Sequence, residues 1–161
     1  MEPFKVVLFG HRYIEDLYII EKRLFSILSE IVKEKEFVEF YIGRNGEFDE
    51  YAASVIKRVQ KRYGKESSAL ILVLPYEVKD IVYYEHYYDE IIIPETLGKV
   101  HPKRAIRVRN EWMVDTADCL IFAVEHNEGG AYRALKYAEG VGKKIFHLIG
   151  ERARACFTEN E

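Results

Sequence analysis

Residues 109–138 constrain the fold of this chain more than any other segment. They combine the pattern of a helix, a short apolar strand, a pair of glycines and a second helix. The strand, CLIFAV at 119–124, is continuously apolar, which is expected for a parallel strand covered on both faces. A short polar stretch then leads to Gly129 and Gly130, and backbone amides at the start of the following helix attract anions. This segment predicts a parallel α/β sheet that holds a phosphate- or carboxylate-bearing ligand.

The rest of the chain repeats this alternation of strands and helices. Apolar runs predict further strands, and helically spaced apolar residues predict the helices between them. The expected strands cover residues 4–9, 37–42, 69–74, 91–93 and 144–149, and the expected helices cover residues 16–32, 49–63 and 102 or 103–116. The tyrosine-rich stretch before Asp89 is expected to be irregular. It would cover the ligand as a lid or, as we slightly favour, contact a second subunit.

Five or six strands alternating with helices favour a Rossmann-like α/β fold with a doubly wound, mainly parallel sheet. A chain of 161 residues suits a single domain, because that size buries roughly 70% of the surface exposed by the unfolded chain. We expect this domain to cover residues 1–150. Residues 151–161, ERARACFTENE, are expected to form a weakly ordered tail.

Composition and charge argue against several classes of protein. The formal net charge of −3 gives no overall attraction to nucleic acid, so a nucleic-acid partner is not expected. No apolar run approaches the roughly 20 residues of a membrane helix, and the start of the chain lacks the pattern of a secretory signal. We therefore expect a cytoplasmic protein without a membrane partner.

Neither a metal site nor a bound cofactor is expected. His86, His101 and His126 lie in separate segments, without the ligand spacing of a dedicated metal site. The sequence has no Walker motif and no intact GxGxxG, which argues against ATP hydrolysis and nicotinamide redox chemistry. Cys119 lies in an apolar strand and Cys156 in the polar tail, so neither a disulfide nor cysteine catalysis is expected.

The loops that follow the predicted strands carry the candidate binding residues. The carboxyl ends of parallel strands meet at one edge of a sheet, so these loops should converge on one crevice. The candidates on the loops and on the helix that should face them are Gly10, His11, Arg12, Gly43, Asn45, Gly46, Phe48, Asp49, Pro75, Tyr76, Arg109, Gly129 and Gly130.

Three of these candidates have alternative interpretations. Arg109 offers a planar fork for a phosphate, or is a surface arginine. Asp49 is most simply a helix N-cap, although a cap beside a ligand can also bind a ribose hydroxyl. Tyr76 is better placed than Phe48 or Trp112 to stack on a nucleobase.

Five segments together resemble the SLOG superfamily, the Rossmann-like group that includes the DNA-processing protein Smf/DprA and the LOG phosphoribohydrolases. The segments are GHR at 10–12, YIGRNGEFD at 41–49, VLPY at 73–76, RNEWMVDTAD at 109–118 and GGAYRALKYA at 129–138. They cover nearly the whole chain, and their order is most similar to the YpsA-like branch. The resemblance implies a pocket for a nucleotide or nucleotide derivative, to which it adds Asn110 and Met113 as ligand-binding residues.

LOG enzymes cleave the N-glycosidic bond of nucleoside monophosphates with a glutamate that this chain lacks. Ala131 replaces the threonine of their glycine motif, and Ala134 stands at the position of the glutamate. An alanine methyl can neither stabilise a positive ribose nor activate water. An enzyme is therefore less favoured, and a displaced acid would have to come from other carboxylates. The candidates are Asp49, Asp115, Asp118 and Glu128.

Three functional hypotheses follow from these observations. The favoured one is a binding or sensor domain for a small nucleotide or ribose-phosphate ligand, without turnover. The alternative is a nucleotide N-glycosidase with a displaced acid, and a DNA-binding protein is the least favoured. A homo-oligomer, a dimer or larger, is also expected because the chain has more aromatic side chains than one sheet needs, with an aromatic content of 14%.

Overall fold

The computed structural model describes residues 2–155 and contains a six-stranded parallel sheet. The strands are β1 (Phe4–Gly10), β2 (Val38–Ile42), β3 (Ser68–Val73), β4 (Glu90–Ile92), β5 (Cys119–Ala123) and β6 (Ile145–His147). They lie side by side in the order β4-β3-β2-β1-β5-β6, and every neighbouring pair is parallel. The expected Rossmann-like α/β fold with a parallel sheet is therefore confirmed.

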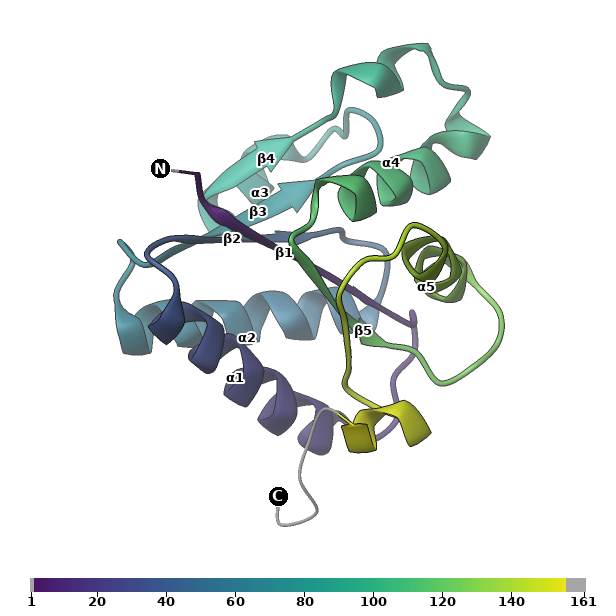
Figure 1. Ribbon diagram of the computed structural model, residues 1–161. Coiled ribbons are helices and arrows are strands. Elements are labelled where there is room, and N and C mark those ends of the chain that lie inside the picture. The colour runs from purple at the N-terminus through teal and green to yellow at the C-terminus, as the bar shows by residue number, and fades with distance from the viewer. Residues whose placement is uncertain (1, 156–161) are drawn as a thin grey trace.

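Helices cover both faces of this sheet (Figure 1). The helices are α1 (Leu17–Glu34), α2 (Glu47–Tyr63), α3 (Ile81–Tyr87), α4 (Pro102–Thr116) and α5 (Gly130–Gly140), with short 3-10 helices η1 (Glu95–Lys99) and η2 (Glu151–Ala155). Helices α1 and α2 pack on one face, and α4 and α5 pack on the other. None of the helices in the described part of the chain is long and apolar enough to cross a bilayer.

Alternate residues of the central strands belong to two separate apolar clusters, one on each face of the sheet. In β1, Val6 and Leu8 pack towards α1 and α2, whereas Val7 and Phe9 pack towards α4 and α5. Since both faces are covered, every position in the middle of the strand is buried, which explains its continuously apolar sequence. Cys119 belongs to the first cluster, and burial raises the pKa of its thiol to about 11, as expected for a packing residue.

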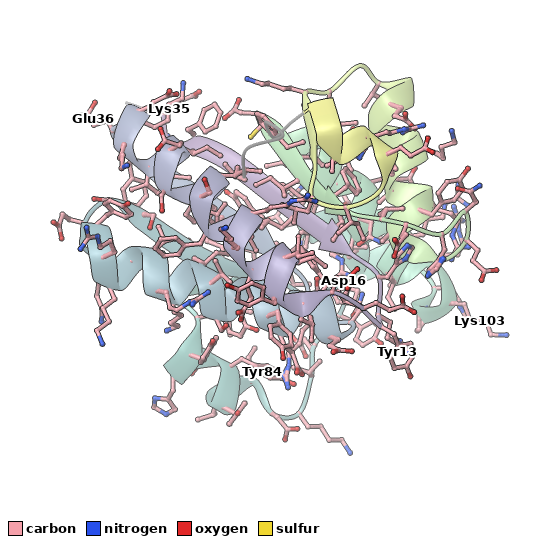
Figure 2. The ribbon with its side chains drawn as sticks, turned by 90° about the horizontal axis from the view of Figure 1, so that it is seen from below. Tyr13, Asp16, Lys35, Glu36, Tyr84 and Lys103 are labelled. Carbon is pink, nitrogen blue, oxygen red and sulfur yellow. The ribbon has the colours of Figure 1, made fainter. Side chains whose placement is uncertain are left out.

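The chain reverses its winding direction between β1 and β5. From β1 it proceeds outwards through β2, β3 and β4, and then returns to place β5 on the other side of β1. Connections that diverge from neighbouring strands leave a crevice at the carboxyl ends of those strands. Helix α1 runs away from this edge, from Asp16, next to Tyr13, to Lys35 and Glu36 at the opposite edge (Figure 2).

Two sequence-based expectations about helices were wrong. Residues 81–87 form helix α3 instead of an irregular stretch; none of its residues is fully buried, so it leaves no buried apolar stripe in the sequence. Its rings instead pack on one another, and the Arg44 guanidinium lies 4.6 Å from the centre of the Tyr84 ring. Helix α2 begins at Glu47 with Gly46 as its N-cap, so Asp49 lies inside the first turn and is not the cap.

The end of the chain differs from expectation where it is described. Strand β6 ends at His147, two residues before the expected end. Residues 151–155 form the 3-10 helix η2, in which the backbone amide of Ala153 donates to the carbonyl of Gly150. The rest of the expected tail, with Cys156, lies outside the described residues.

Candidate functional site

A cavity of about 600 Å³ opens at the carboxyl ends of β1, β2 and β5, where the winding reverses. Its walls come from the loops after these strands, from α4 and from the start of α5. Ten of the predicted ligand-binding residues line it: Gly10, His11, Arg12, Gly43, Asn45, Asp49, Arg109, Asn110, Gly129 and Gly130. Glu128, which was predicted only as a candidate acid, also lines it.

Five predicted ligand-binding residues do not line this cavity. They are Gly46, Phe48, Pro75, Tyr76 and Met113. Phe48 belongs to the core, where it packs so closely under β1 that a Cβ atom added to Gly10 would clash with its ring. Met113 is fully buried between α4 and the sheet. Both side chains point into the core because helical periodicity turns these positions towards the sheet.

The positions of Pro75 and Tyr76 follow from the strand order. They come after β3, which is separated from β1 by β2 and therefore lies away from the reversal point. Tyr76 is exposed outside the cavity, although its hydroxyl acts electrostatically on Arg109. The expectation that Tyr76 supplies the stacking surface of the cavity was therefore wrong.

Arg109 is the largest fully buried side chain, with an exposed fraction of 2%, and it lines the floor of the cavity. Its Nη1 donates to the carbonyl of Val73 at the end of β3 (2.8 Å), and its Nε donates to Oδ1 of Asn110 (2.9 Å). Its Nη2 donates to no group in residues 2–155. Burial lowers the pKa of Arg109, but a guanidinium keeps its proton in proteins. The surface interpretation of this arginine is therefore wrong, and a fixed positive charge lies beneath the cavity.

Gly43 lets the backbone after β2 approach the Arg109 guanidinium. A Cβ atom at this position would lie 2.9 Å from Nη1 of Arg109, closer than real Cβ contacts allow. Any larger residue here would displace the guanidinium or the loop. The glycine therefore determines where the buried charge lies.

Asp49 is the acidic residue whose charge acts most strongly on Arg109. Its Oδ2 accepts a hydrogen bond from the Asn45 amide (2.9 Å), which holds the loop after β2 against the first turn of α2. Burial raises the pKa of its carboxyl group to about 6, although the Asn45 bond and the charge of Arg109 act in the opposite direction. The side chain therefore changes charge close to neutral pH while lining the cavity.

His11 joins the loops after β1 and β5. Its Nε2 accepts hydrogen bonds from the backbone amides of Glu125 and His126, both at 2.9 Å. Burial lowers the pKa of His11, and the nearby His126 adds to this effect, against the opposing charges of Glu125 and Glu128. A neutral ring is required for Nε2 to accept, so this histidine acts as a clamp between two walls of the cavity.

The amino-terminal end of α5 points its free amides at the same cavity. Gly129 is the N-cap of the helix, Gly130 is its first residue, and neither has a side chain that would cover the amides. The Asn110 side chain lies close to Gly130, since a Cβ atom added there would be 4.0 Å from Nδ2. Arg133, one turn further along α5, adds a third cation to the wall, besides Arg12 and Arg109. Together these groups form a surface that suits an anion.

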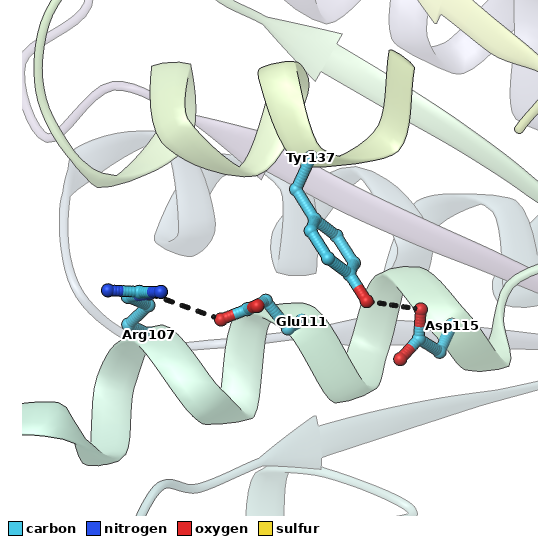
Figure 3. A network of polar contacts seen from close by, with 4 residues as sticks. All are labelled: Arg107, Glu111, Asp115 and Tyr137. Carbon is cyan, nitrogen blue, oxygen red and sulfur yellow. Dashed lines mark hydrogen bonds and ion pairs between the residues drawn. The ribbon is translucent and has the colours of Figure 1, made fainter. Parts of the chain in front are cut away.

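Two of the candidate acids lie at the opposite edge of the sheet. Asp115, near the end of α4, accepts a hydrogen bond from the Tyr137 hydroxyl at 2.8 Å (Figure 3). Asp118 accepts a hydrogen bond from the Lys5 amide (2.8 Å) and so ties the start of β5 to β1. Neither residue lines the cavity, so both were wrong as candidates for a displaced acid in this cavity.

Ten residues of the cavity wall were not predicted from the sequence. They are Phe9, Tyr13, Ile14, Glu15, Ile106, Glu125, His126, Ala131, Arg133 and Ile149. The signal for the residues on the loops was available, because they directly follow the strand ends. Arg133 could have been found from its position one helical turn after Gly129 and Gly130. Among residues 2–155, no group of three metal-binding side chains lies close enough together to hold an ion.

Solved structures with the same fold include DNA-processing and molybdenum cofactor proteins. DNA processing protein A from Streptococcus pneumoniae superposes with a TM-score of 0.66 and 15% identity over 94% of this chain and 53% of that chain. DNA processing protein A from Helicobacter pylori superposes with a TM-score of 0.61 and 16% identity, over 90% of this chain and 65% of that chain. This chain therefore spans between half and two thirds of these two proteins.

The molybdenum cofactor proteins match over more of their own length. The molybdenum cofactor binding protein from Rippkaea orientalis gives a TM-score of 0.59 and 17% identity over 91% of this chain and 77% of that chain. The molybdenum cofactor carrier protein from Chlamydomonas reinhardtii superposes with a TM-score of 0.59 and 14% identity. The match covers 99% of this chain and 86% of that chain. No protein-family model and no curated protein sequence matches this chain. The fold is the Rossmann-like fold of the SLOG proteins, as the resemblance implied, and the YpsA-like branch stays a prediction.

Proposed function

We propose that the cavity binds a small nucleotide or nucleotide-derived ligand and that the protein acts as a binding or sensor domain. One observation carries the proposal. The buried guanidinium of Arg109, with Nη2 unpaired in the described chain, lies beneath the same cavity as the amide-bearing start of α5. A phosphate group satisfies both, because guanidinium and helix amides are its usual partners in proteins.

The acids of the cavity favour a ligand that also carries hydroxyl groups. The walls beside the cationic groups carry four acids, Glu15, Asp49, Glu125 and Glu128. Carboxylates repel a bare anion, but they accept hydrogen bonds from ribose hydroxyls. The volume of about 600 Å³ lies within the range of roughly 300–1,000 Å³ typical of sites for small organic ligands. A ribose phosphate therefore suits the cavity better than inorganic phosphate.

The structural neighbours support two kinds of ligand. One group carries or binds the molybdenum cofactor, and the Helicobacter pylori protein binds single-stranded DNA. For this chain the net charge of −3 favours a small ligand over a long polyanion. We expect a single-stranded DNA oligonucleotide to bind more weakly than a nucleoside monophosphate at physiological salt.

Thermal unfolding against a panel of ligands tests this proposal. The panel contains nucleoside monophosphates, ribose 5-phosphate, ADP-ribose, cyclic nucleotides and nicotinamide dinucleotides. Ligand present at 100 times its dissociation constant should stabilise the protein by about 2.7 kcal/mol. Arg109→Gln should abolish the shift, and Gly130→Asp should abolish it by placing a carboxylate at the helix start.

The matched control is Arg107→Gln. Arg107 lies on the same helix, but it is 69% exposed and forms an ion pair with Glu111 outside the cavity (Figure 3). Its loss should leave ligand binding unchanged. Absence of a shift with every ligand, or equal effects of Arg107→Gln and Arg109→Gln, would contradict the proposal.

Asp49 supports a second candidate function, cleavage of the N-glycosidic bond of the nucleotide. A general acid works best when its pKa lies near the operating pH, and burial raises the pKa of Asp49 to about 6. In that case the protein would release free base from a nucleoside monophosphate, and Asp49→Asn would stop the release without preventing binding. Chromatography of the products measures this. Intact nucleotide after prolonged incubation would exclude the enzyme and leave the binding domain.

A further inference from the structure

We infer that Tyr13 and Ile106 form the part of the cavity that receives a planar ring of the ligand, such as a nucleobase. The inference rests on the proposed function and deepens it. It states that the ligand carries a ring as well as a phosphate. It also assigns the recognition of that ring to two side chains.

Tyr13 and Ile106 are large apolar side chains that line the cavity and are nevertheless exposed to solvent. Tyr13 is 78% exposed on the loop after β1, and Ile106 is 39% exposed on α4. Tyr13 contacts no other aromatic ring and no cation among residues 2–155, unlike all three tyrosines of α3. Most of its ring is therefore accessible to a ligand, and aromatic faces accept nucleobases of any sequence.

The backbone on both sides of Tyr13 is held in place. Before it, the Arg12 carbonyl accepts from the Glu47 amide (2.8 Å), and the Arg12 Nε donates to the carbonyl of Asn45 (3.1 Å). After it, Ile14 packs into the core beneath the loop. Since its neighbours are fixed, Tyr13 can meet a ligand with little loss of backbone entropy, and such preorganisation favours binding.

The other rings near the cavity are less suited to this role. The His126 ring already lies 5.1 Å from the ring of His11, and Tyr76 lies outside the cavity. Phe9 lines the cavity but is buried and stacked on Phe122 at 5.3 Å. Tyr13 is therefore the aromatic side chain that remains for the ligand.

Calorimetric titration with and without the ring tests the inference. The probes are the four nucleoside 5′-monophosphates and ribose 5-phosphate, which shares their sugar and phosphate but has no base. We expect the best nucleotide to bind at least about 5-fold more tightly than ribose 5-phosphate, because a stacked base adds affinity of this order. Tyr13→Ala should remove this advantage and leave the dissociation constant of ribose 5-phosphate unchanged. Tyr13→Phe should keep it, and Ile106→Ala should reduce it.

Tyr18→Ala is the matched control. Tyr18 is 79% exposed on the first turn of α1, yet it does not line the cavity, so its loss should leave every dissociation constant unchanged. Equal binding of ribose 5-phosphate and the nucleotides would overturn the ring site but leave the proposed function intact. The ring site would also be overturned if Tyr13→Ala bound nucleotides like the wild type, or if it weakened the binding of all probes equally. Failure of every probe to bind the wild type would overturn the proposed function and the ring site together.

Discussion

Asp49 is the cavity residue whose charge the fold disfavours most clearly. Its pKa of about 6 lies above the ordinary value of 3.8, so the folded protein holds the proton more tightly than the unfolded chain. The stability that this group contributes is complete below its ordinary pKa and is lost as the pH rises through about 6. Asp49→Asn should therefore be more stable than the wild type at pH 8 by about 1–2 kcal/mol, discounted for partial exposure, and equally stable at pH 4.

Urea denaturation at the two pH values measures this difference. The hydrogen bond from the Asn45 amide survives in the variant, because a backbone amide can donate to a carboxyl or to an amide oxygen. Glu47→Gln is the control, since Glu47 lies in the same turn but is not among the groups that shift the pKa of Asp49. A variant that is less stable than the wild type at pH 8 would show that Arg109 outweighs burial.

At the level of single residues, the sequence predicted which side chains have suitable chemistry better than it predicted where they lie in the fold. Arg109 was identifiable as a phosphate ligand from its charge and its segment. Its burial was not, because it depends on the carbonyl of Val73, 36 positions earlier, and on the missing side chain of Gly43. Tyr76 shows the opposite error: its residue type was right for stacking, but the strand order placed it outside the cavity.

The elements of the fold followed closely from apolar patterning. Mainly apolar runs located β1, β2, β3 and β5, because strands covered on both faces leave that signature. Helix α3 was missed because its tyrosines are held by one another and by Arg44, and none is fully buried. Apolar periodicity in a sequence reveals helices that bury one face. A helix stabilised by rings and cations on its surface shows little such periodicity.

The stability that His11 supplies by joining the loops after β1 and β5 should depend on pH. Burial lowers the pKa of His11, so the unfolded chain takes up a proton first when the pH falls below about 6.5. The stability supplied by the clamp is therefore complete above that pH and is lost below it. His11→Phe removes the acceptor for the Glu125 and His126 amides and should cost about 1 kcal/mol at pH 7.5.

The same substitution should cost less at pH 5.5, because the wild type has already lost part of this stability. Chemical denaturation at both pH values measures the change. The control is His86→Phe, at an exposed position on α3 away from the cavity, which should show no such pH dependence. An equal cost of His11→Phe at both pH values would show that His11 does not act as a neutral acceptor.

For the whole molecule, α3 carries the surface best suited to contact a second copy of the chain. Val82 and Tyr83 are 62% and 68% exposed, and Tyr87 is 38% exposed. Adjacent exposed apolar side chains of this kind mark interaction surfaces more often than isolated ones do. The helix has only seven residues and no fully buried side chain, and so short a helix gains most of its stability from packing. A second copy of α3 would supply that packing, and its tyrosines would then lie between subunits and leave the cavity uncovered.

Light scattering coupled to size exclusion tests this arrangement. The wild type should elute with twice the mass of one chain, and Tyr83→Glu should elute as a monomer because it buries a charge in the contact. Tyr18→Glu, at an equally exposed tyrosine on α1, should remain a dimer. If α3 instead covered the ligand, Tyr83→Glu would change ligand affinity at constant mass. A dimer that survives Tyr83→Glu but not Tyr18→Glu would place the contact at the start of α1, next to Tyr13 and the mouth of the cavity.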